Sequence, residues 1–414
     1  MARAGAGRRQ SVALFCMPET GHFQRLRSLI SDLARSGVAV HVFTHRRFAP
    51  QVERSGGVFV DLFSPYPLEA ADDTSFPVPC RYVTYAATFA DAIAGEVEKT
   101  APSLVIHDSF AVIGRVIAAR LRLPRVNICS GHNVTPGPFV EALARDPRVK
   151  PSPECIRAAM VLRDDHGIAD ASPFAYVASP SRELNIYCEP PQFLEPEERI
   201  AFKPLAFYGS IPDPDAREPE DPARRSRFPG HEPRLRKVYV SFGTVVWRWY
   251  PEEARRTLHT LAGAFARMRD VQVVISLGGA AMADDMVPAL SRANVTVDAY
   301  VDQWRLLQEA DAVVTHHGLN STHEAIFHGV PMLSCPFFWD QPALSAKCQS
   351  FGLAVPLAYP PRAPLDDQAV HDAMAQLQQR RQGIEVALAQ ARAWETAVIA
   401  ERPTVLRQML ALAG

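Results

Sequence analysis

Short apolar runs of strand length alternate with helical patterns along most of this sequence. Residues 12–17 form one such run, and residues 23–35 follow with apolar side chains on one helical face. The alternation predicts βαβ units and parallel sheets, in which ligands bind beyond the carboxyl ends of the strands. The further apolar runs lie at 38–44, 58–62, 104–107, 126–129, 238–242, 271–277, 295–299, 312–314, 330–334 and 353–355.

A proline-rich, charged stretch divides this alternation into two halves. Residues 211–236 contain six prolines between blocks of acidic and basic residues, a composition typical of a solvated linker. At 414 residues the chain is also too long for one ordinary core. We therefore expect an N-terminal α/β domain over 1–210, a linker over 211–236, a second α/β domain over 237–385 and C-terminal helices over 386–414.

Charge and cysteine usage exclude several classes of protein. The formal net charge is −1, which argues against nucleic acid or an anionic membrane as a partner. No apolar segment approaches the length of a membrane span, so no stable membrane association is expected. The seven cysteines are scattered and never form a C-x-x-C pair, which favours reduced thiols in a cytoplasmic protein over a zinc site or a disulfide framework.

The stretch 312–345 carries the most chemistry in the second half. A β-branched strand ends at Thr315, the turn His316-His317-Gly318 follows, and a helix is expected to start near Asn320 and Ser321. Free N–H groups and the positive end of the helix dipole make such a turn an anion site. Two adjacent histidines without a third ligand make a poor metal site, so no metal is expected.

Glu324 has two interpretations at this level. Ser321 and Glu324 fit a capping box, with Glu three positions after the cap. Glu324 also lies four residues after Asn320, so both side chains stand on one helical face above the turn. The residues alone leave both interpretations open.

The order of these motifs resembles the donor-binding signature of family 1 glycosyltransferases. The matching residues are Tyr300-Val301-Asp302-Gln303, then H-H-G-L-N-S-x-x-E from His316, G-V-P-M from Gly329, and Asp340-Gln341. The resemblance implies an inverting enzyme that uses a nucleotide sugar. It also implies the GT-B fold, in which two Rossmann-like, doubly wound domains face across a cleft and the last helices pack back on the N-terminal domain.

The same resemblance assigns roles to single residues. It implies that Tyr300, beside Val301, stacks on the nucleobase, that Gln303 lies near the nucleoside and that Glu324 binds the ribose hydroxyls. The pyrophosphate would be bound by His316, Gly318, Asn320 and Ser321 together with the loop that contains Gly243 and Thr244. The sugar hydroxyls would be hydrogen-bonded by Asp340 and Gln341. Because a carboxylate can accept two hydrogen bonds from a ribose diol, Glu324 favours a UDP-hexose over a dTDP-deoxysugar, which stays as the alternative donor.

His22 and Asp108 are the candidate catalytic residues of the first half. Each follows or ends a strand of the same sheet, so their side chains can meet at its carboxyl edge. Taken alone, a histidine near a turn is more often structural. The resemblance implies that His22 is the general base for the acceptor hydroxyl and that Asp108 pairs with it. His107 is a rival candidate, but it points to the opposite face of its strand.

The acceptor is the least constrained part of the prediction. Phe76 and Tyr82 lie in an aromatic stretch, and His132 and Asn133 follow a strand end, so these four are candidate acceptor-binding residues. We expect transfer of a hexose to a hydroxyl of a small molecule, such as a secondary metabolite, without a cofactor; a homodimer is left open. The rivals are a sugar-nucleotide epimerase on the same fold and a non-catalytic subunit that activates another glycosyltransferase.

Overall fold

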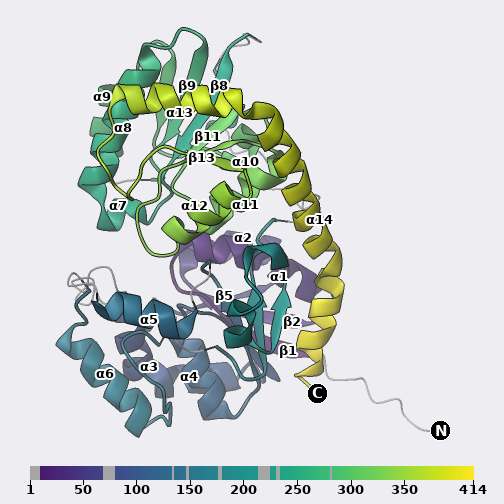
Figure 1. Ribbon diagram of the computed structural model, residues 1–414. Helices are drawn as coiled ribbons and strands as arrows, with labels where there is room; N and C mark the ends of the chain where they lie inside the picture. Colours follow the sequence, from purple (N-terminus) through teal and green to yellow (C-terminus); the bar gives the residue numbers. More distant parts are fainter. Residues whose placement is uncertain are drawn as a thin grey trace. The chain divides into compact units, whose positions relative to one another are not determined.

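The chain folds into two compact α/β units. The computed structural model describes residues 10–68, 80–132, 135–145, 149–175, 180–212, 224–229, 234–279 and 282–414. Unit 1 consists of Met1–Pro212 together with Val398–Gly414, and unit 2 consists of Asp213–Ala397. Each unit is built around one parallel sheet (Figure 1). The two units are therefore described separately.

The sheet of unit 1 has seven strands in the order β3-β2-β1-β4-β5-β6-β7, and every pair is parallel. The chain moves outward from β1 to β3 and then returns to pair β4 with the other side of β1, so the direction of winding reverses between β1 and β4. Such a reversal opens a crevice beyond the carboxyl ends of those two strands. The strands are β1 (Ser11–Phe15), β2 (Ala39–Thr44), β3 (Val58–Asp61), β4 (Leu104–Asp108), β5 (Arg125–Cys129), β6 (Leu184–Tyr187) and β7 (Leu205–Phe207).

Helices cover both faces of this sheet because right-handed crossovers leave its two halves on opposite sides (Figure 1). Helix α1 buries one apolar stripe, which includes Phe23, Leu26 and Leu33. The α-helices are α1 (Thr20–Arg35), α2 (Ala49–Arg54), α3 (Arg81–Glu98), α4 (Val112–Leu121), α5 (Pro136–Arg145) and α6 (Pro153–Asp164), and short 3₁₀ turns lie at Arg46–Phe48, Pro191–Phe193 and Glu198–Phe202.

The sheet of unit 2 repeats the layout with six parallel strands in the order β10-β9-β8-β11-β12-β13. Its winding reverses between β8 and β11, where Ser241 and Thr315 are register partners. The strands are β8 (Arg236–Ser241), β9 (Val271–Ser276), β10 (Val295–Asp298), β11 (Ala312–Thr315), β12 (Met332–Ser334) and β13 (Ala354–Pro356). The helices are α7 (Val246–Trp249), α8 (Pro251–Ala266), α9 (Ala283–Leu290), α10 (Gln303–Leu307), α11 (Leu319–His328), α12 (Gln341–Ser350), α13 (Asp367–Gln379) and α14 (Arg381–Ala411).

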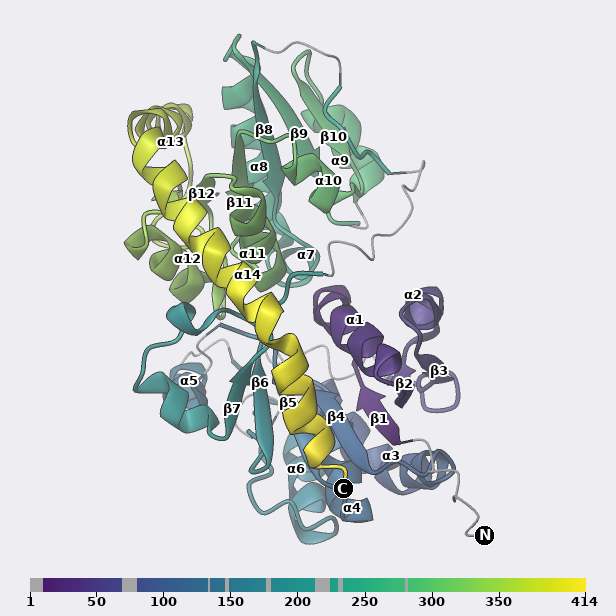
Figure 2. The ribbon, with the colours of Figure 1, turned by 90° about the vertical axis from the view of Figure 1, so that its right-hand side faces the viewer.

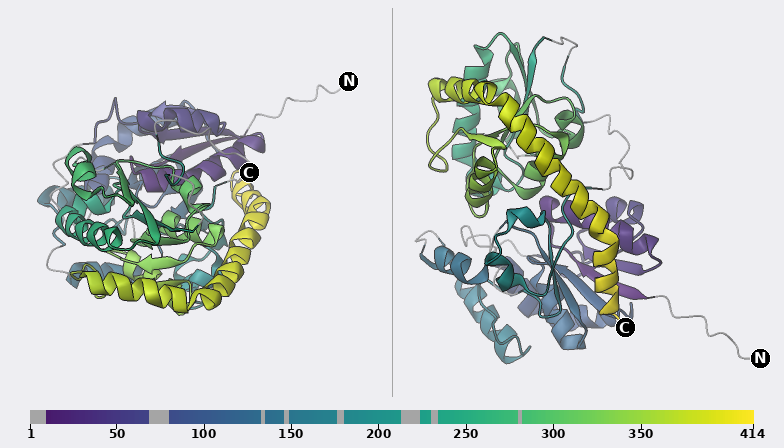
Figure 3. Two further views of the ribbon diagram at one scale, coloured as in Figure 1. Left: turned by 90° about the horizontal axis from the view of Figure 1, so that it is seen from above. Right: turned by 45° about the vertical axis from the view of Figure 1, so that its right-hand side comes forward.

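Helix α14 is one long helix that supplies residues to both units (Figures 2 and 3). In unit 2, Glu395 is buried against His323 of α11, with 2.5 Å between Glu395 Oε1 and His323 Nδ1. In unit 1, the buried Arg402 donates hydrogen bonds to the carbonyls of Tyr208 and Ile211. The tail is therefore part of the core structure of each unit.

The segment between the two sheets is not solvated along its whole length. Arg225 forms a parallel bridge with Val301, and its carbonyl accepts a hydrogen bond from Asp302 N–H. Phe228 is buried beneath Lys237. The described residues 224–229 of the expected linker thus contact unit 2 just beyond the end of β10.

Candidate active site

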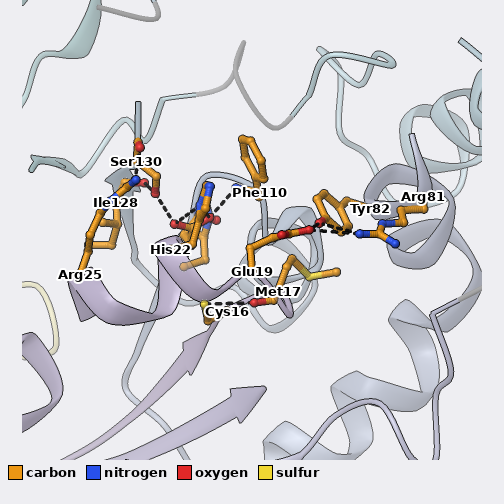
Figure 4. Close-up of polar contacts among 12 residues, drawn as sticks. Cys16, Met17, Glu19, His22, Arg25, Arg81, Tyr82, Phe110, Ile128 and Ser130 are labelled. Carbon is orange, nitrogen blue, oxygen red and sulfur yellow. Dashed lines mark hydrogen bonds and ion pairs between the residues drawn. The ribbon is translucent and has the colours of Figure 1, made fainter. Parts of the chain in front are cut away.

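The sheet of unit 1 brings His22 and Asp108 together at its point of reversal (Figure 4). His22 lies in the first turn of α1, directly after β1, and Asp108 is the last residue of β4. His22 Nδ1 lies 2.8 Å from Asp108 Oδ1 and 3.0 Å from Oδ2. The structure therefore contains a histidine–carboxylate pair at the edge where a doubly wound sheet binds ligands.

The Asp108 carboxylate is fully enclosed and saturated with donors. It also accepts hydrogen bonds from the backbone N–H of Phe110, at 2.9 Å, and from the hydroxyl of Ser130. Burial works to raise the pKa of Asp108, but His22 and these hydrogen bonds outweigh it, so the pKa lies below its usual value. An ionised Asp108 holds the proton of His22 on Nδ1, which leaves Nε2 with a lone pair able to accept a proton.

The side chain of His22 is only partly accessible to solvent and packs against an aromatic ring. Its side chain is 13% exposed, and its ring centroid lies 4.2 Å from that of Phe110. The neighbouring His107 faces elsewhere: its Nδ1 donates to the carbonyl of Asp108, and its Nε2 accepts from Arg125. Burial and the charge of Arg125 lower the pKa of His107 to about 3. His107 is therefore a neutral core residue with both ring nitrogens occupied.

The expected acceptor-binding residues of unit 1 are less accessible than the sequence suggests. Tyr82 is 1% exposed, and its hydroxyl contacts the carboxylate of Glu19, which also binds Arg81 (Figure 4). His132 is 3% exposed, with its Nδ1 2.9 Å from Glu189 Oε2. Tyr82 is therefore a buried partner of Glu19 and His132 a buried partner of Glu189, and a contact of either residue with an acceptor stays a prediction. Phe76 and Asn133 lie outside the described residues.

Unit 2 places His316 over the backbone of two loops at its own point of reversal. A Cβ atom on Gly243, which follows β8, would lie 2.7 Å from His316 Nε2, and a Cβ atom on Gly318 would lie 2.3 Å from it. Gly243 also has a φ of +66° and is therefore suited to glycine on two grounds, while the adjacent Thr244 is exposed. The close approach of the imidazole requires glycine at both positions.

His316 is neutral and has one unused nitrogen. Burial lowers its pKa to about 4, although a hydrogen bond with the backbone of Ser241 works in the opposite direction. Its Nδ1 is buried and has no hydrogen-bond partner among the described residues. A buried polar atom without a partner is costly, which marks the position where a ligand would complete the site.

Helix α11 starts earlier than the capping-box interpretation requires. Gly318 is its N-cap residue, so Asn320 and Ser321 both lie in the first turn. The hydroxyl of Ser321 donates to Gln303 Oε1 at 3.3 Å instead of capping the helix. The capping box of Ser321 and Glu324 is therefore not formed, and the N-cap residue makes no side-chain hydrogen bond to the first turn, whose N–H groups suit an anion.

Glu324 takes part in a network that reaches back to β8. Gln303 Nε2 donates to Glu324 Oε2 at 2.7 Å, and the hydroxyl of the buried Tyr239 lies 3.3 Å from Gln303 Oε1. Burial raises the pKa of Glu324 to about 7. Sequence reasoning identified Gln303 and Glu324 but missed Tyr239, because a tyrosine inside a buried strand gives no local sign of a polar contact.

The remaining expected donor residues lie at the same edge of unit 2. Tyr300 is 37% exposed, and the guanidinium of Arg224 lies 4.6 Å from its ring centroid, whereas Val301 is buried. Asp340 is the N-cap residue of α12. Gln341 accepts hydrogen bonds from the backbone N–H groups of two preceding phenylalanines through its Oε1, so its amide group is held in one orientation.

Comparisons with known proteins match both the sequence and the fold. The model of the family described as UDP-glucoronosyl and UDP-glucosyl transferase matches residues 236–363. NDP-glycosyltransferase YjiC of Bacillus subtilis (strain 168) is 23% identical over 350 residues, 83% of this chain and 83% of the relative. The chain is a glycosyltransferase with the GT-B fold, and its match to the family model covers residues 236–363.

Other relatives of this glycosyltransferase agree. Oleandomycin glycosyltransferase of Streptomyces antibioticus is 25% identical over 366 residues, 84% of this chain and 79% of the relative. The solved structure of the glycotransferase of kitacinnamycin has a TM-score of 0.76 at 22% identity and covers 97% of this chain and 100% of its own. CalG4, the calicheamicin glycosyltransferase, has a TM-score of 0.72 at 21% identity, with 98% and 100% covered.

Two further observations describe the glycosyltransferase. In the described part of the chain, no helix combines the length and apolar character needed to cross a membrane. Within the same ranges, no three His, Cys, Asp or Glu side chains gather as metal ligands would.

Proposed function

We propose that this glycosyltransferase moves a hexose from a UDP-sugar to a hydroxyl of a small molecule, with inversion and without a metal ion. The observation that carries the proposal is the pairing of His22 with an ionised Asp108 at the point of reversal of unit 1. This arrangement leaves Nε2 of His22 as a base. The names of the relatives, oleandomycin glycosyltransferase among them, support a secondary metabolite as the acceptor.

The proposed reaction is a single displacement. Nε2 of His22 takes the proton of the acceptor hydroxyl while its oxygen forms a bond to the anomeric carbon. The bond from that carbon to the phosphate oxygen breaks on the opposite side, and the nucleoside diphosphate leaves with the electron pair. Asp108 stabilises the imidazolium that forms, since a carboxylate beside the ring favours its charged state.

The site of unit 2 suits the leaving group. The N–H groups of the first turn of α11 can hydrogen-bond the diphosphate, where negative charge develops in the transition state. Because His316 is neutral and gives its one N–H to the backbone of Ser241, it places an uncharged ring, and not a cation, beside this turn.

Glu324 supports UDP over a deoxynucleotide donor. Its Oε2 accepts from Gln303, and the carboxylate lies where the resemblance places the ribose, whose two hydroxyls can both donate to it. A dTDP-deoxysugar is the second candidate donor because two similar structures, the rhamnosyltransferase SpnG and the glycosyltransferase VinC, are described in complex with thymidine diphosphate or DTDP.

The experiment combines a donor screen with one substitution. UDP-glucose, UDP-galactose, dTDP-glucose and dTDP-rhamnose are offered with an acceptor library, and products are detected by mass spectrometry. We expect His22→Ala to lower turnover by about 10²- to 10⁴-fold, while UDP binding measured by calorimetry stays within a few-fold.

A control variant shows whether a loss of turnover is specific to His22. His371→Ala, which removes an exposed histidine on α13, should leave turnover unchanged. Unchanged turnover in His22→Ala would refute the base. Equal efficiency with UDP-glucose and dTDP-glucose, unaltered by Glu324→Ala, would refute the assignment of the donor.

A further inference from the structure

Ser130 completes a closed circuit of contacts around the His22–Asp108 pair (Figure 4). His22 of α1 contacts Asp108 at the end of β4, and Asp108 accepts from the hydroxyl of Ser130, which follows β5. The carbonyl of Ser130 in turn accepts from Arg25 Nη1, on the same helix as His22 and three residues later. Residues three apart share one face of a helix, so the circuit begins and ends on one face of α1.

We propose that Ser130 is a positioning residue for the general base. Its hydroxyl fixes the plane of the Asp108 carboxylate and sets how strongly that carboxylate attracts the proton of His22. This inference rests on the proposed function, because it concerns the same base.

The hydrogen bonds at Asp108 divide between its two oxygens. Oδ1 accepts from the N–H of Phe110 at 2.9 Å, and Oδ2 accepts from Ser130. His22 Nδ1 lies within 3.0 Å of both, at the side of the carboxylate that the other two donors leave open. With a donor on each oxygen, the carboxylate cannot turn about its bond without breaking a charge-assisted hydrogen bond.

Ser130 itself is held from two sides. It is 4% exposed, and its hydroxyl has a second acceptor within reach, the carbonyl of Ile128 at 3.3 Å. Arg25 fixes its carbonyl. The hydroxyl is therefore placed by the backbone of the strand end and by α1, and not by Asp108 alone.

The electrostatic consequence has a definite sign. A hydrogen bond from Ser130 spreads part of the carboxylate charge, so removing it strengthens the attraction of Asp108 for the Nδ1 proton of His22 and favours the protonated ring. A base must be neutral to act, so the acidic limb of the pH–rate profile moves to higher pH. Removing the carboxylate itself must move the limb the other way.

Two other carboxylates in the described part of unit 1, Glu19 and Glu189, each have a partner. Glu19, which precedes α1, binds Arg81 and the hydroxyl of Tyr82 from α3. Beyond β5, Glu189 pairs with His132. Since Ser130→Ala leaves all of these in place, a moved limb reports the contact between Ser130 and Asp108.

The test measures kcat/KM for the acceptor between pH 5 and 9 in the full-length enzyme. We expect Ser130→Ala to lower kcat by about tenfold and to move the acidic limb up by about one pH unit, the scale of one hydrogen bond to a charged group. In Ser130→Thr, which keeps the hydroxyl, the acidic limb should lie at the same pH as in the unmodified enzyme. In Asp108→Asn the acidic limb should move to lower pH. Ser103→Ala, at the amino end of β4, is the matched control and should change nothing.

The outcomes separate this inference from the proposed function. If His22→Ala abolishes turnover but Ser130→Ala leaves the limb unmoved, Ser130 is an ordinary buried serine and the base stands. If His22→Ala has no effect, the base itself is refuted. Should Ser130→Ala be too inactive to assay, NMR titration of the His22 ring in this variant gives the same answer, and an unchanged midpoint overturns the inference.

Discussion

His316 lies so close to Gly318 that any side chain there would collide with its ring. An added Cβ would be 2.3 Å from Nε2 and 2.8 Å from Cε1, both far inside van der Waals contact. The ring must therefore move if Gly318 is replaced, and its unpartnered Nδ1 moves with it. The glycine therefore leaves room for the histidine beside the turn that we propose binds the diphosphate.

Gly318→Ala should accordingly weaken donor binding more than it weakens the fold. Overpacking costs about 1–3 kcal/mol, and if this cost falls on the donor-bound geometry, affinity for UDP-glucose drops by roughly 5-fold to 150-fold. Calorimetric titration with UDP-glucose measures this change in the dissociation constant. Gly95→Ala is the control, since a Cβ there meets nothing within 4 Å. An unchanged dissociation constant in Gly318→Ala would show that His316 does not contact the donor.

Glu324 should make donor binding depend on pH. Burial raises its pKa to about 7, and only the ionised carboxylate accepts hydrogen bonds from both ribose hydroxyls. As pH falls through 7 the carboxylate gains a proton, so affinity for UDP-glucose is full at pH 8 and about tenfold lower at pH 6. UDP-glucose is the suitable probe because its diphosphate does not titrate in this range. Glu324→Gln should bind weakly and without pH dependence, and a flat profile in the unmodified enzyme would contradict the assignment.

The pair of His323 and Glu395 should show the asymmetry expected of buried charges. Both side chains are at most 1% exposed, so Glu395→Ala leaves His323 buried without this partner. The free energy of unfolding, measured by urea denaturation, should fall by about 3–5 kcal/mol. Replacing both residues by leucine should recover most of this loss. Glu385→Ala, which breaks an exposed pair on the same helix, should cost about 0.5 kcal/mol or less. Equal losses in the single and double variants would mean that the two charges do not compensate each other.

Much of this architecture can be predicted from the sequence because its signals are local. The strand at Ser11–Phe15, the helix after it and the turn at His316–Gly318 each follow from side-chain periodicity and composition within a few residues. Topology then places His22 near Asp108, because strand ends on either side of a reversal must meet.

The contacts that the sequence does not reveal join residues distant along the chain. Ser130 reaches Asp108 across 22 residues, and Tyr82 reaches Glu19 across 63. Nothing near Tyr82 distinguishes a tyrosine that lines an open surface from one whose hydroxyl is taken up by a buried carboxylate. The sequence left the capping-box interpretation of Ser321 open for a related reason: Gln303, from another helix, binds both the Ser321 hydroxyl and Glu324.

Unit 1 combines two distant segments of the chain, and this has a consequence for folding during translation. Its core includes Met409, which is fully buried, and Gln10 near the start contacts the carbonyl of Leu410, 400 residues later. Arg402 satisfies the carbonyls of Tyr208 and Ile211. During translation the sheet of unit 1 is synthesised first, then unit 2, and only then the part of α14 that packs in unit 1. Until α14 has been synthesised, unit 1 lacks the residues that bury this part of its apolar surface, so we expect unit 1 to complete its folding only after unit 2 has been made.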